Sequence, residues 1–325
     1  MITTYLPNHG GLQTIPDEDV LPRFGEALWI DMFDPTPEER LKVNNALGME
    51  LPTREDMEEI EASSRLYIED GGLFMTALVL ANSGTEKPVS GVVTFVLVKG
   101  KLITLRYTDP QPFRTFIARS RRNILGGEKA GYVLAALLDT IIDRLADILE
   151  RVSSEIEIIS QRIFDPDGDE RPITSADFQR VLRSLGRRQD LSGKIRDSLL
   201  SIGRMLAFLQ SGLDRKENKD VLVHVKTMMR DVQSLQDHSS YLATKLSYLQ
   251  DATLGLINID QNNIIKIMSV AAMVFMPPTL FASIWGMNFH HMPELDQWWA
   301  YPISLLIMMI SAITPYLWFK RRGWL

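Results

Sequence analysis

The chain has 325 residues, of which 45% are hydrophobic, and a formal charge of −6. This length allows two structural units. The acidic balance disfavours a nucleic-acid partner, because such binding needs a positive surface. The sequence has no cysteine, which excludes disulfides and thiolate metal sites.

The first part of the chain, residues 1–125, is predicted to be a cytoplasmic α/β domain, which gives the soluble N-terminal part an α+β fold. Apolar and β-branched runs bounded by turn residues predict strands. Helix starts are expected where Pro, Thr and acidic residues follow one another, at 35–39 and 52–56. Parallel and antiparallel pairing both stay open. The expected strands cover 26–32, 73–81, 92–98 and 102–107.

A helical period begins at Ala130 and opens a cytoplasmic region of long helices, 126–266. The first helix should stop at the turn residues 165–168. The second should start at 174–177, where the sequence fits a loose capping box, and run to about Gly212. A charged turn is expected at 215–220.

The third helix carries apolar residues at alternating spacings of four and three, a heptad stripe. We expect one stalk helix over 218–285, roughly 100 Å long at 1.5 Å per residue, passing from water into a membrane. A self-contained coiled coil with a membrane anchor is the alternative. The stripe consists of Val221, Val225, Met228, Val232, Leu235, Leu242, Leu246, Leu249 and Leu256, with Ser239 and Thr253 in its gaps.

Two uncharged runs, 267–285 and 298–319, are long enough to cross a bilayer as helices. The loop between them, 286–297, has no Lys or Arg, whereas the tail, 320–325, begins with three basic residues. Such a bias places both termini in the cytoplasm and the loop outside. The prediction is a multi-pass protein of the cell (inner) membrane.

A stripe of polar or small residues with a few apolar ones follows one face of the third helix. Such a stripe is typical either of close helix packing or of a water-filled lining. Two spans cannot enclose a pore, so a lining would require several copies. The stripe comprises Asp251, Gly255, Asn258, Asn262, Ile265, Ser269, Ala272, Met276, Thr279, Ser283 and Gly286.

The upper end of the stripe resembles a known family. The chain has Trp-Gly-Met-Asn-Phe at 285–289 and Met-Pro-Glu-Leu at 292–295. It also has Phe-Met-Pro at 275–277, Tyr-Pro at 301–302 and a basic ending before Trp324. This pattern resembles the CorA family of divalent-cation transporters. The likeness is looser in the N-terminal part, through 29–31, 35–36 and 55–56.

The resemblance implies a funnel-shaped homopentamer that carries Mg2+, and also Co2+ or Ni2+, through a pore. It assigns the selectivity filter to Gly286, Met287 and Asn288, and a gate to Met268 and Met276. Asn and Gly carbonyls can bind a hydrated Mg2+ through its water shell. Lipid, divalent cations and further copies of the chain are the implied partners, with no organic cofactor.

Two departures from the family pattern leave further sites open. Glu55 and Asp56 match a regulatory Mg2+ position, but the usual partner Asp on the stalk is Thr227 here, with Asp231 one turn away. A solvated helix start is the other interpretation.

The outer mouth has His290 and His291 where relatives often have Glu, with Glu294 nearby. Neutral imidazoles would become cationic below a pH of about 6.5. A tolerated loop variation and capture of Zn2+, Co2+ or Ni2+ stay open as alternatives.

Two other functions compete with Mg2+ transport. One is a zinc transporter of the related ZntB type, which could be proton-coupled. The other is a membrane-anchored structural or signalling oligomer. An enzyme is not expected, because the five histidines form no metal motif or triad.

Overall fold

The computed structural model describes residues 1–8, 11–15, 24–59, 61–85, 87–120, 129–164, 175–214, 217–288, 290, 292–293 and 297–324. Two compact units emerge. The first comprises Met1–Glu170 with Arg183–Leu249, and the second Arg171–Leu182 with Gln250–Leu325. The domain boundaries expected from sequence stay a prediction.

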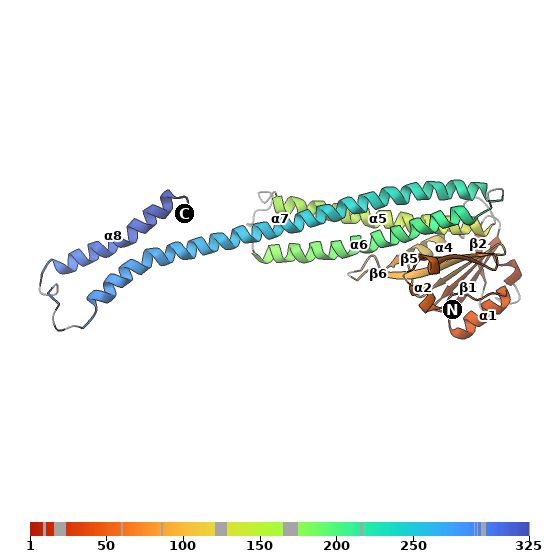
Figure 1. Ribbon diagram of the computed structural model, residues 1–325, viewed down its shortest axis with the longest axis horizontal. Helices are drawn as coiled ribbons and strands as arrows, with labels where there is room; N and C mark the ends of the chain where they lie inside the picture. Colours follow the sequence, from red (N-terminus) through yellow and green to blue (C-terminus); the bar gives the residue numbers. More distant parts are fainter. Residues whose placement is uncertain are drawn as a thin grey trace. The chain divides into compact units, whose positions relative to one another are not determined.

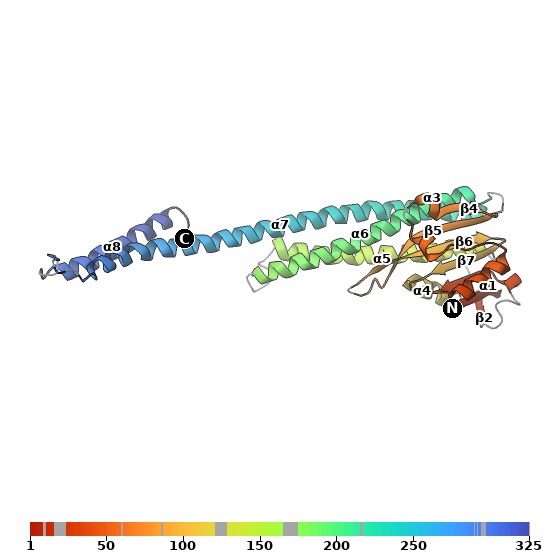
Figure 2. The ribbon, with the colours of Figure 1, turned by 60° about the horizontal axis from the view of Figure 1, so that its bottom comes forward.

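The first unit begins with a seven-stranded sheet in the order β2-β1-β3-β7-β6-β5-β4 (Figures 1 and 2). The pair β3 and β7 is parallel and all other pairs are antiparallel. The strands are β1 (Ile2–Asn8), β2 (Gly11–Ile15), β3 (Trp29–Phe33), β4 (Leu66–Glu69), β5 (Gly72–Ala81), β6 (Val89–Val98) and β7 (Lys101–Arg106).

Four of these strands confirm the sequence prediction, and the mixed pairing resolves what the pattern left open. Prediction missed β1, β2 and β4. It also started β3 too early, because a 3-10 helix, η2 (Phe24–Glu26), precedes the strand. β4 is short and half exposed, so it lacks the apolar run that marks a buried strand.

Helices cover both faces of the sheet. On one face, Val43 and Leu47 of α1 (Pro37–Leu47) and Met57 of α2 (Arg54–Glu58) share a buried core with Ile30 and other strand residues. Both helices start within the predicted segments, and each start is a capping box, which was not predicted there. On the other face lie α4 (Gln111–Ser120) and the start of α5 (Ala130–Phe164). The short helix α3 (Ala62–Arg65) leads into β4.

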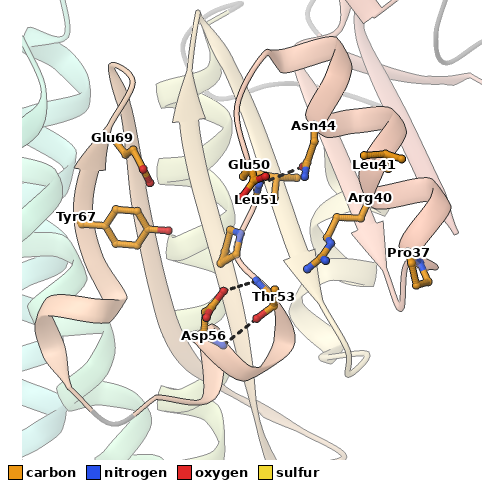
Figure 3. A pocket seen from close by; sticks show the side chains of 11 residues that line it. Pro37, Arg40, Leu41, Asn44, Glu50, Leu51, Thr53, Asp56, Tyr67 and Glu69 are labelled. Atoms are coloured by element: carbon orange, nitrogen blue, oxygen red, sulfur yellow. Dashed lines mark hydrogen bonds between the residues drawn. The ribbon is translucent and has the colours of Figure 1, made fainter.

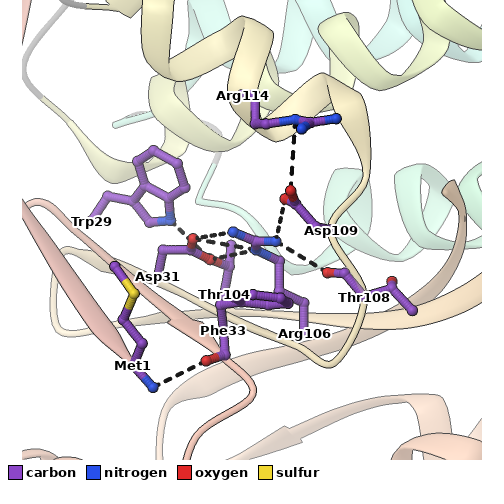
Figure 4. A network of polar contacts seen from close by, with 9 residues as sticks. All are labelled: Met1, Trp29, Asp31, Phe33, Thr104, Arg106, Thr108, Asp109 and Arg114. Atoms are coloured by element: carbon purple, nitrogen blue, oxygen red, sulfur yellow. Dashed lines mark hydrogen bonds and ion pairs between the residues drawn. The ribbon is translucent and has the colours of Figure 1, made fainter. Parts of the chain in front are cut away.

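A buried ion pair joins two neighbouring strands (Figure 4). The Arg106 guanidinium donates to both carboxylate oxygens of Asp31, with Nη2 2.9 Å from Oδ2. Its carbon lies 4.5 Å from the Phe33 ring centroid and 4.7 Å from that of Phe113. Burial opposes the Arg106 charge, but the bonds and charges of Asp31 and Asp109 outweigh this and raise its pKa.

The outer edge of β5 is covered by a helix where β4 no longer pairs with it. The Leu78 amide donates to Ser201 Oγ at 3.0 Å, and Ser198 Oγ donates to the Leu78 carbonyl at 2.6 Å. Both serines belong to α6 (Ser175–Gly212). These bonds occupy the backbone groups that an exposed sheet edge would offer to another strand.

Three long helices complete the first unit: α5 (Ala130–Phe164), α6 and the first part of α7 (Lys219–Trp285). These spans confirm the predicted helices; the predicted stop at 165–168 and Thr174 of the capping box lie outside the described residues. In Figures 1 and 2, α5 and α6 run beside α7. Lys245 Nζ of α7 lies 2.6 Å from Glu157 of α5.

The heptad stripe of α7 is buried by this same chain. Gly131 of α5 faces Val221, and Gly203 of α6 faces Val232. The amide of Gln236 donates to the Leu199 carbonyl at 3.1 Å. Nine stripe positions between Val221 and Thr253 are buried, and Leu235 and Leu256 are half-buried.

The second unit contains the rest of α7 and the last helix, α8 (Ala300–Arg321). Both helices are long and apolar enough to cross a membrane, by length and composition. α7 continues through Pro277 and Pro278. Membrane-spanning helices tolerate such prolines when local groups satisfy the freed backbone.

Candidate functional site

The polar and small stripe of α7 lies open within the second unit. Ten of its eleven members, from Asp251 to Gly286, are exposed, and Ser269 is half-buried. Met276 is 68% exposed. Exposure by itself decides little here, because most of α7 beyond Leu256 is exposed in a single copy.

The same segment of α7 also has a shielded face, formed by its buried and half-buried residues, which shows on which side of the helix the stripe lies. Val270 is 5% exposed. The half-buried residues that continue its face are Val274, Pro277, Pro278, Phe281 and Trp285. At each turn, a residue of the shielded face comes two positions before a residue of the stripe. The stripe residues concerned are Ala272, Met276, Thr279 and Ser283. Two residues are about 200° around a helix of 3.6 residues per turn, so the stripe lies opposite the shielded face.

α8 has a shielded face of its own at helical spacing. Phe319, 2% exposed, ends it, and the half-buried members are Ser304, Ile307, Met308, Ser311, Ala312 and Pro315. Serine and alanine allow two helices to approach closely. Each helix of the second unit therefore has one shielded face, and the stripe lies on the opposite side of α7 from its shielded face.

The stripe ends where α7 ends. The Gly286 amide donates to the Ala282 carbonyl at 2.9 Å, and the Met287 amide donates to the Ile284 carbonyl at 3.3 Å. A Cβ at Gly286 would lie 3.0 Å from the Ala282 oxygen, so this tight closure favours glycine. Met287 and Asn288 follow as exposed residues outside the helix.

Inside the span, the hydroxyl of Thr279 donates to the Phe275 carbonyl at 2.7 Å. Its donor is therefore used within the helix, and its oxygen lone pairs stay available to water or an ion. The Asn258 and Asn262 side chains below it are exposed. The polar members of the stripe thus offer oxygen acceptors, and Asp251 is its only carboxylate.

Asp56, expected to bind a regulatory ion, borders a cavity of about 400 Å3 (Figure 3). The Thr53 amide donates to Asp56 Oδ2 at 2.8 Å. This bond lowers the pKa of Asp56 below its usual value, with help from the Arg40 charge. Glu50 and Glu69 also line the cavity, and the charges of Glu69 and Asp56 add to burial in raising the pKa of Tyr67.

Asp231 interacts with other groups in a single chain. Burial raises the pKa of Asp139 on α5, and the charges of Asp143 and Asp231 add to this effect while His224 opposes it. No interaction found among the described residues joins Asp231 to Glu55 or Asp56 within one copy. Among those residues, no group of three His, Cys, Asp or Glu could hold a metal ion. A site shared between copies stays a prediction.

Of the outer-mouth residues, His290 is described and exposed. His291 and Glu294 lie outside the described residues. The proposed roles of all three therefore stay predictions.

Some contacts were not anticipated from the sequence. Arg40 and Tyr67 beside Asp56 come from separate elements, and no local pattern connects them. The Arg322 guanidinium lies 4.5 Å from the Trp318 ring centroid. This pair has the i, i+4 spacing of helical neighbours, which could have suggested it.

A soluble α+β part, a long helix and two helices able to span a bilayer define a class of membrane protein with two spans per chain. The model of the family described as CorA-like Mg2+ transporter protein matches residues 25–321. The chain belongs to this family, which confirms the resemblance found in the sequence.

Two curated relatives share much of the sequence. "Magnesium transport protein CorA" of Mannheimia succiniciproducens is 37% identical over 309 residues, 95% of each chain. The protein of the same name from Escherichia coli strain K12 is 36% identical over 300 residues, 92% of each chain.

Solved structures extend the likeness to the fold. The complete CorA magnesium transporter of Methanocaldococcus jannaschii superposes with a TM-score of 0.77 at 18% identity, covering 100% of this chain and 99% of that one. The ZntB cytoplasmic domain of Vibrio parahaemolyticus gives 0.53 at 9% identity, covering 80% and 98%. At these identities the likeness concerns the fold alone.

Proposed function

We propose that this protein carries Mg2+ across a membrane as a homopentamer, through a pore lined by the α7 stripe. The observation that carries the proposal is the uncovered stripe, which ends at Gly286-Met287-Asn288 on the side of α7 opposite its shielded face. The choice of Mg2+ as the ion rests on the curated relatives, which are named magnesium transport proteins.

Five copies would turn each stripe position into a ring. The filter would consist of Asn288 amide oxygens and backbone carbonyls of Gly286 and Met287. Mg2+ gives up its water reluctantly, so neutral oxygens that bind its water shell suit both selection and release. Co2+ and Ni2+ are the other proposed cargoes.

The apolar rings below the filter are the proposed gate. Met268 and Met276 are 67% and 68% exposed in one copy, and Met276 lies on the stripe, as does Ile265. An apolar constriction closes to ions by losing its water. The polar rings of Asn258, Asn262 and Asp251 would hold cations below it.

The proposed location is the inner membrane, with both termini in the cytoplasm. Lys320, Arg321 and Arg322 follow the second span directly, whereas the loop at 286–297 has no Lys or Arg. This is the charge bias of the positive-inside rule. Transport, rather than catalysis, is the activity of such a pore.

The test is metal uptake into liposomes containing the purified full-length chain. Asn288→Ala should abolish Mg2+ uptake while the oligomer keeps its size in gel filtration. Asn263→Ala, one position off the stripe, is the matched control and should transport normally. Normal uptake by Asn288→Ala would reject the filter.

The zinc alternative is separated by competition in the same liposomes. Excess Mg2+ should block uptake of Co2+ and Ni2+ if Mg2+ is the preferred ion. Zn2+ uptake that is insensitive to Mg2+ and follows a proton gradient would favour ZntB-like transport. No ion flux at all would favour the structural oligomer.

A further inference from the structure

Four basic residues lie at the ends of the two spans that are away from the loop 286–297. Lys266 precedes the first span, and Lys320, Arg321 and Arg322 end the second. Counted from the loop, Lys266 is 19 residues below Trp285 and Arg321 is 21 residues after Ala300. These are similar distances of roughly 30 Å at 1.5 Å per residue. Figures 1 and 2 show α8 running back along the direction of α7.

These charges are not neutralised within the spans. The sequence has no Asp or Glu between Asp260 and Glu294, and none after Asp296. No ion pair to a described carboxylate is found for any of the four basic residues. A membrane protein with such a patch presents a strong positive field where lipid headgroups lie.

Contacts at the end of α8 orient part of this patch. The Arg322 guanidinium stacks on Trp318, 4.5 Å from the ring centroid. The Arg322 amide also donates to the carbonyls of Trp318 and Phe319 at 3.2 and 3.1 Å. A guanidinium is planar, and stacking on an aromatic face orients that plane while its edge N–H donors stay free, a geometry suited to the oxygens of a phosphate.

The chain then folds back on itself. Gly323 has φ +70°, a left-handed conformation that glycine adopts without strain. The Trp324 amide donates to the Phe319 carbonyl at 3.1 Å, and the two rings lie 5.2 Å apart. Trp318 and Trp324 remain 49% and 41% exposed, as aromatic residues of a membrane interface do.

We propose that this patch, formed by Lys266, Lys320, Arg321 and Arg322 with Trp318 and Trp324, binds the phosphodiester headgroup of an anionic phospholipid. The proposal depends on the membrane placement in the proposed function. A lipid fits better than a soluble anion because exposed apolar residues adjoin the charges. Leu317, for example, is 47% exposed and can lie against acyl chains.

The experiment uses the full chain reconstituted in phosphatidylcholine vesicles. Brominated phosphatidylglycerol and brominated phosphatidylcholine are compared as quenchers of tryptophan fluorescence. The wild type should prefer the anionic lipid several-fold, since each basic residue near a surface contributes up to about five-fold at low salt. About 0.5 M NaCl should reduce the preference.

Lys320→Gln/Arg321→Gln/Arg322→Gln should bring the quenching ratio of the two lipids close to one. The matched control is Arg183→Gln/Arg196→Gln/Arg204→Gln. It removes the same charge from exposed positions of α6 and should keep the preference. An unchanged ratio in the first triple variant, or an equal loss in the control, overturns the proposal.

Two further measurements separate the causes. Arg322→Lys keeps the charge but loses the planar stack, so a partial loss of about two-fold is expected; no loss removes Trp318 from the proposal. About 10 mM inorganic phosphate should not compete, and competition would show a soluble-anion site instead.

The lipid test needs no ion flux. Asn288→Ala should therefore retain the lipid preference even where uptake is lost. This outcome separates failure of the lipid proposal from failure of the proposed function.

Discussion

The two parts of α7 each carry a regular stripe of residues, and the two stripes differ in composition and in burial. In the first unit, the stripe from Val221 to Leu249 is apolar and is buried by α5 and α6 of the same chain. In the second unit, the stripe from Asp251 to Gly286 is mainly polar or small, with a few apolar residues, and lies opposite the shielded face. One helix therefore closes a core in one unit and has an uncovered face in the next.

The same contrast holds for polar groups. In the first unit, buried polar groups such as Asp31 and Arg106 satisfy each other. In the second, the oxygens of the stripe have no partner chain to face in a single copy. Polar residues of a membrane span usually face a bundle interior or a water-filled cavity, which supports the pore proposed for the second unit.

The largest effect on stability is expected from breaking the buried ion pair between Asp31 and Arg106 in the first unit. Arg106→Leu leaves the Asp31 carboxylate buried without its cation, at a cost of about 3–5 kcal/mol in the free energy of unfolding. Urea unfolding in detergent, followed by circular dichroism, measures it. Arg114→Leu, at a 67% exposed side chain in the same network, is the control and should cost less than about 1 kcal/mol.

The contrast between the stripes is tested by truncating one residue in each. Leu246, 0% exposed, should cost about 2–5 kcal/mol when changed to Ala, because a cavity remains in the core. Met276→Ala should change unfolding by about 0.5 kcal/mol or less. It should instead alter Mg2+ flux in liposomes. A large loss of stability from Met276→Ala would mean that this stripe packs within the chain.

The sequence predicted elements best where one periodicity persists over many residues. The helices at 130–164 and 219–285 follow from long runs of 3–4 spacing, and the helix at 175–212 follows from a capping signal at its start. The short strand at 66–69 did not, because its side chains are half exposed and show no alternation. The partners of the heptad stripe were also missed, since periodicity marks a buried face without naming what covers it.

Some parts of the candidate site could also be predicted from the sequence and others could not. The stripe from Asp251 to Gly286 followed from spacing, and the filter followed from the resemblance. The cavity beside Asp56 could not be predicted, because Arg40, Tyr67 and Glu69 reach it from different elements. Contacts between distant elements depend on the tertiary fold, which a local pattern does not contain.

A smaller effect, on Mg2+ flux, is expected from changing Asp251, the first residue of the stripe. Five copies would place five Asp251 carboxylates around one axis and concentrate cations there. Asp251→Lys should slow Mg2+ flux by about ten-fold or more, the effect of a barrier of 1.4 kcal/mol. Gln250→Lys adds a charge one position away and should slow flux less. Equal effects would show that the register of the stripe is wrong.

The smallest effect concerns Asp56, whose carboxylate already accepts the Thr53 amide. Because this bond lowers the pKa of Asp56, its stabilising contribution is present above the unfolded pKa of about 3.9. It is lost as the pH falls through the lower folded value. Asp56→Ala should therefore weaken the start of α2 at pH 7, by about 1 kcal/mol or less, and the difference from wild type should shrink below pH 4.

Loss of this cap must be separated from loss of a regulatory ion. If Asp56 also binds Mg2+ between copies, high Mg2+ should protect the wild-type full-length protein from protease, because a ligand of the folded state stabilises it. Asp56→Ala should lose that protection. Thr53→Ala removes the hydroxyl that accepts the Asp56 amide but keeps the carboxylate, so it should retain protection. Equal Mg2+ protection in wild type and Asp56→Ala would leave Asp56 as a helix cap alone.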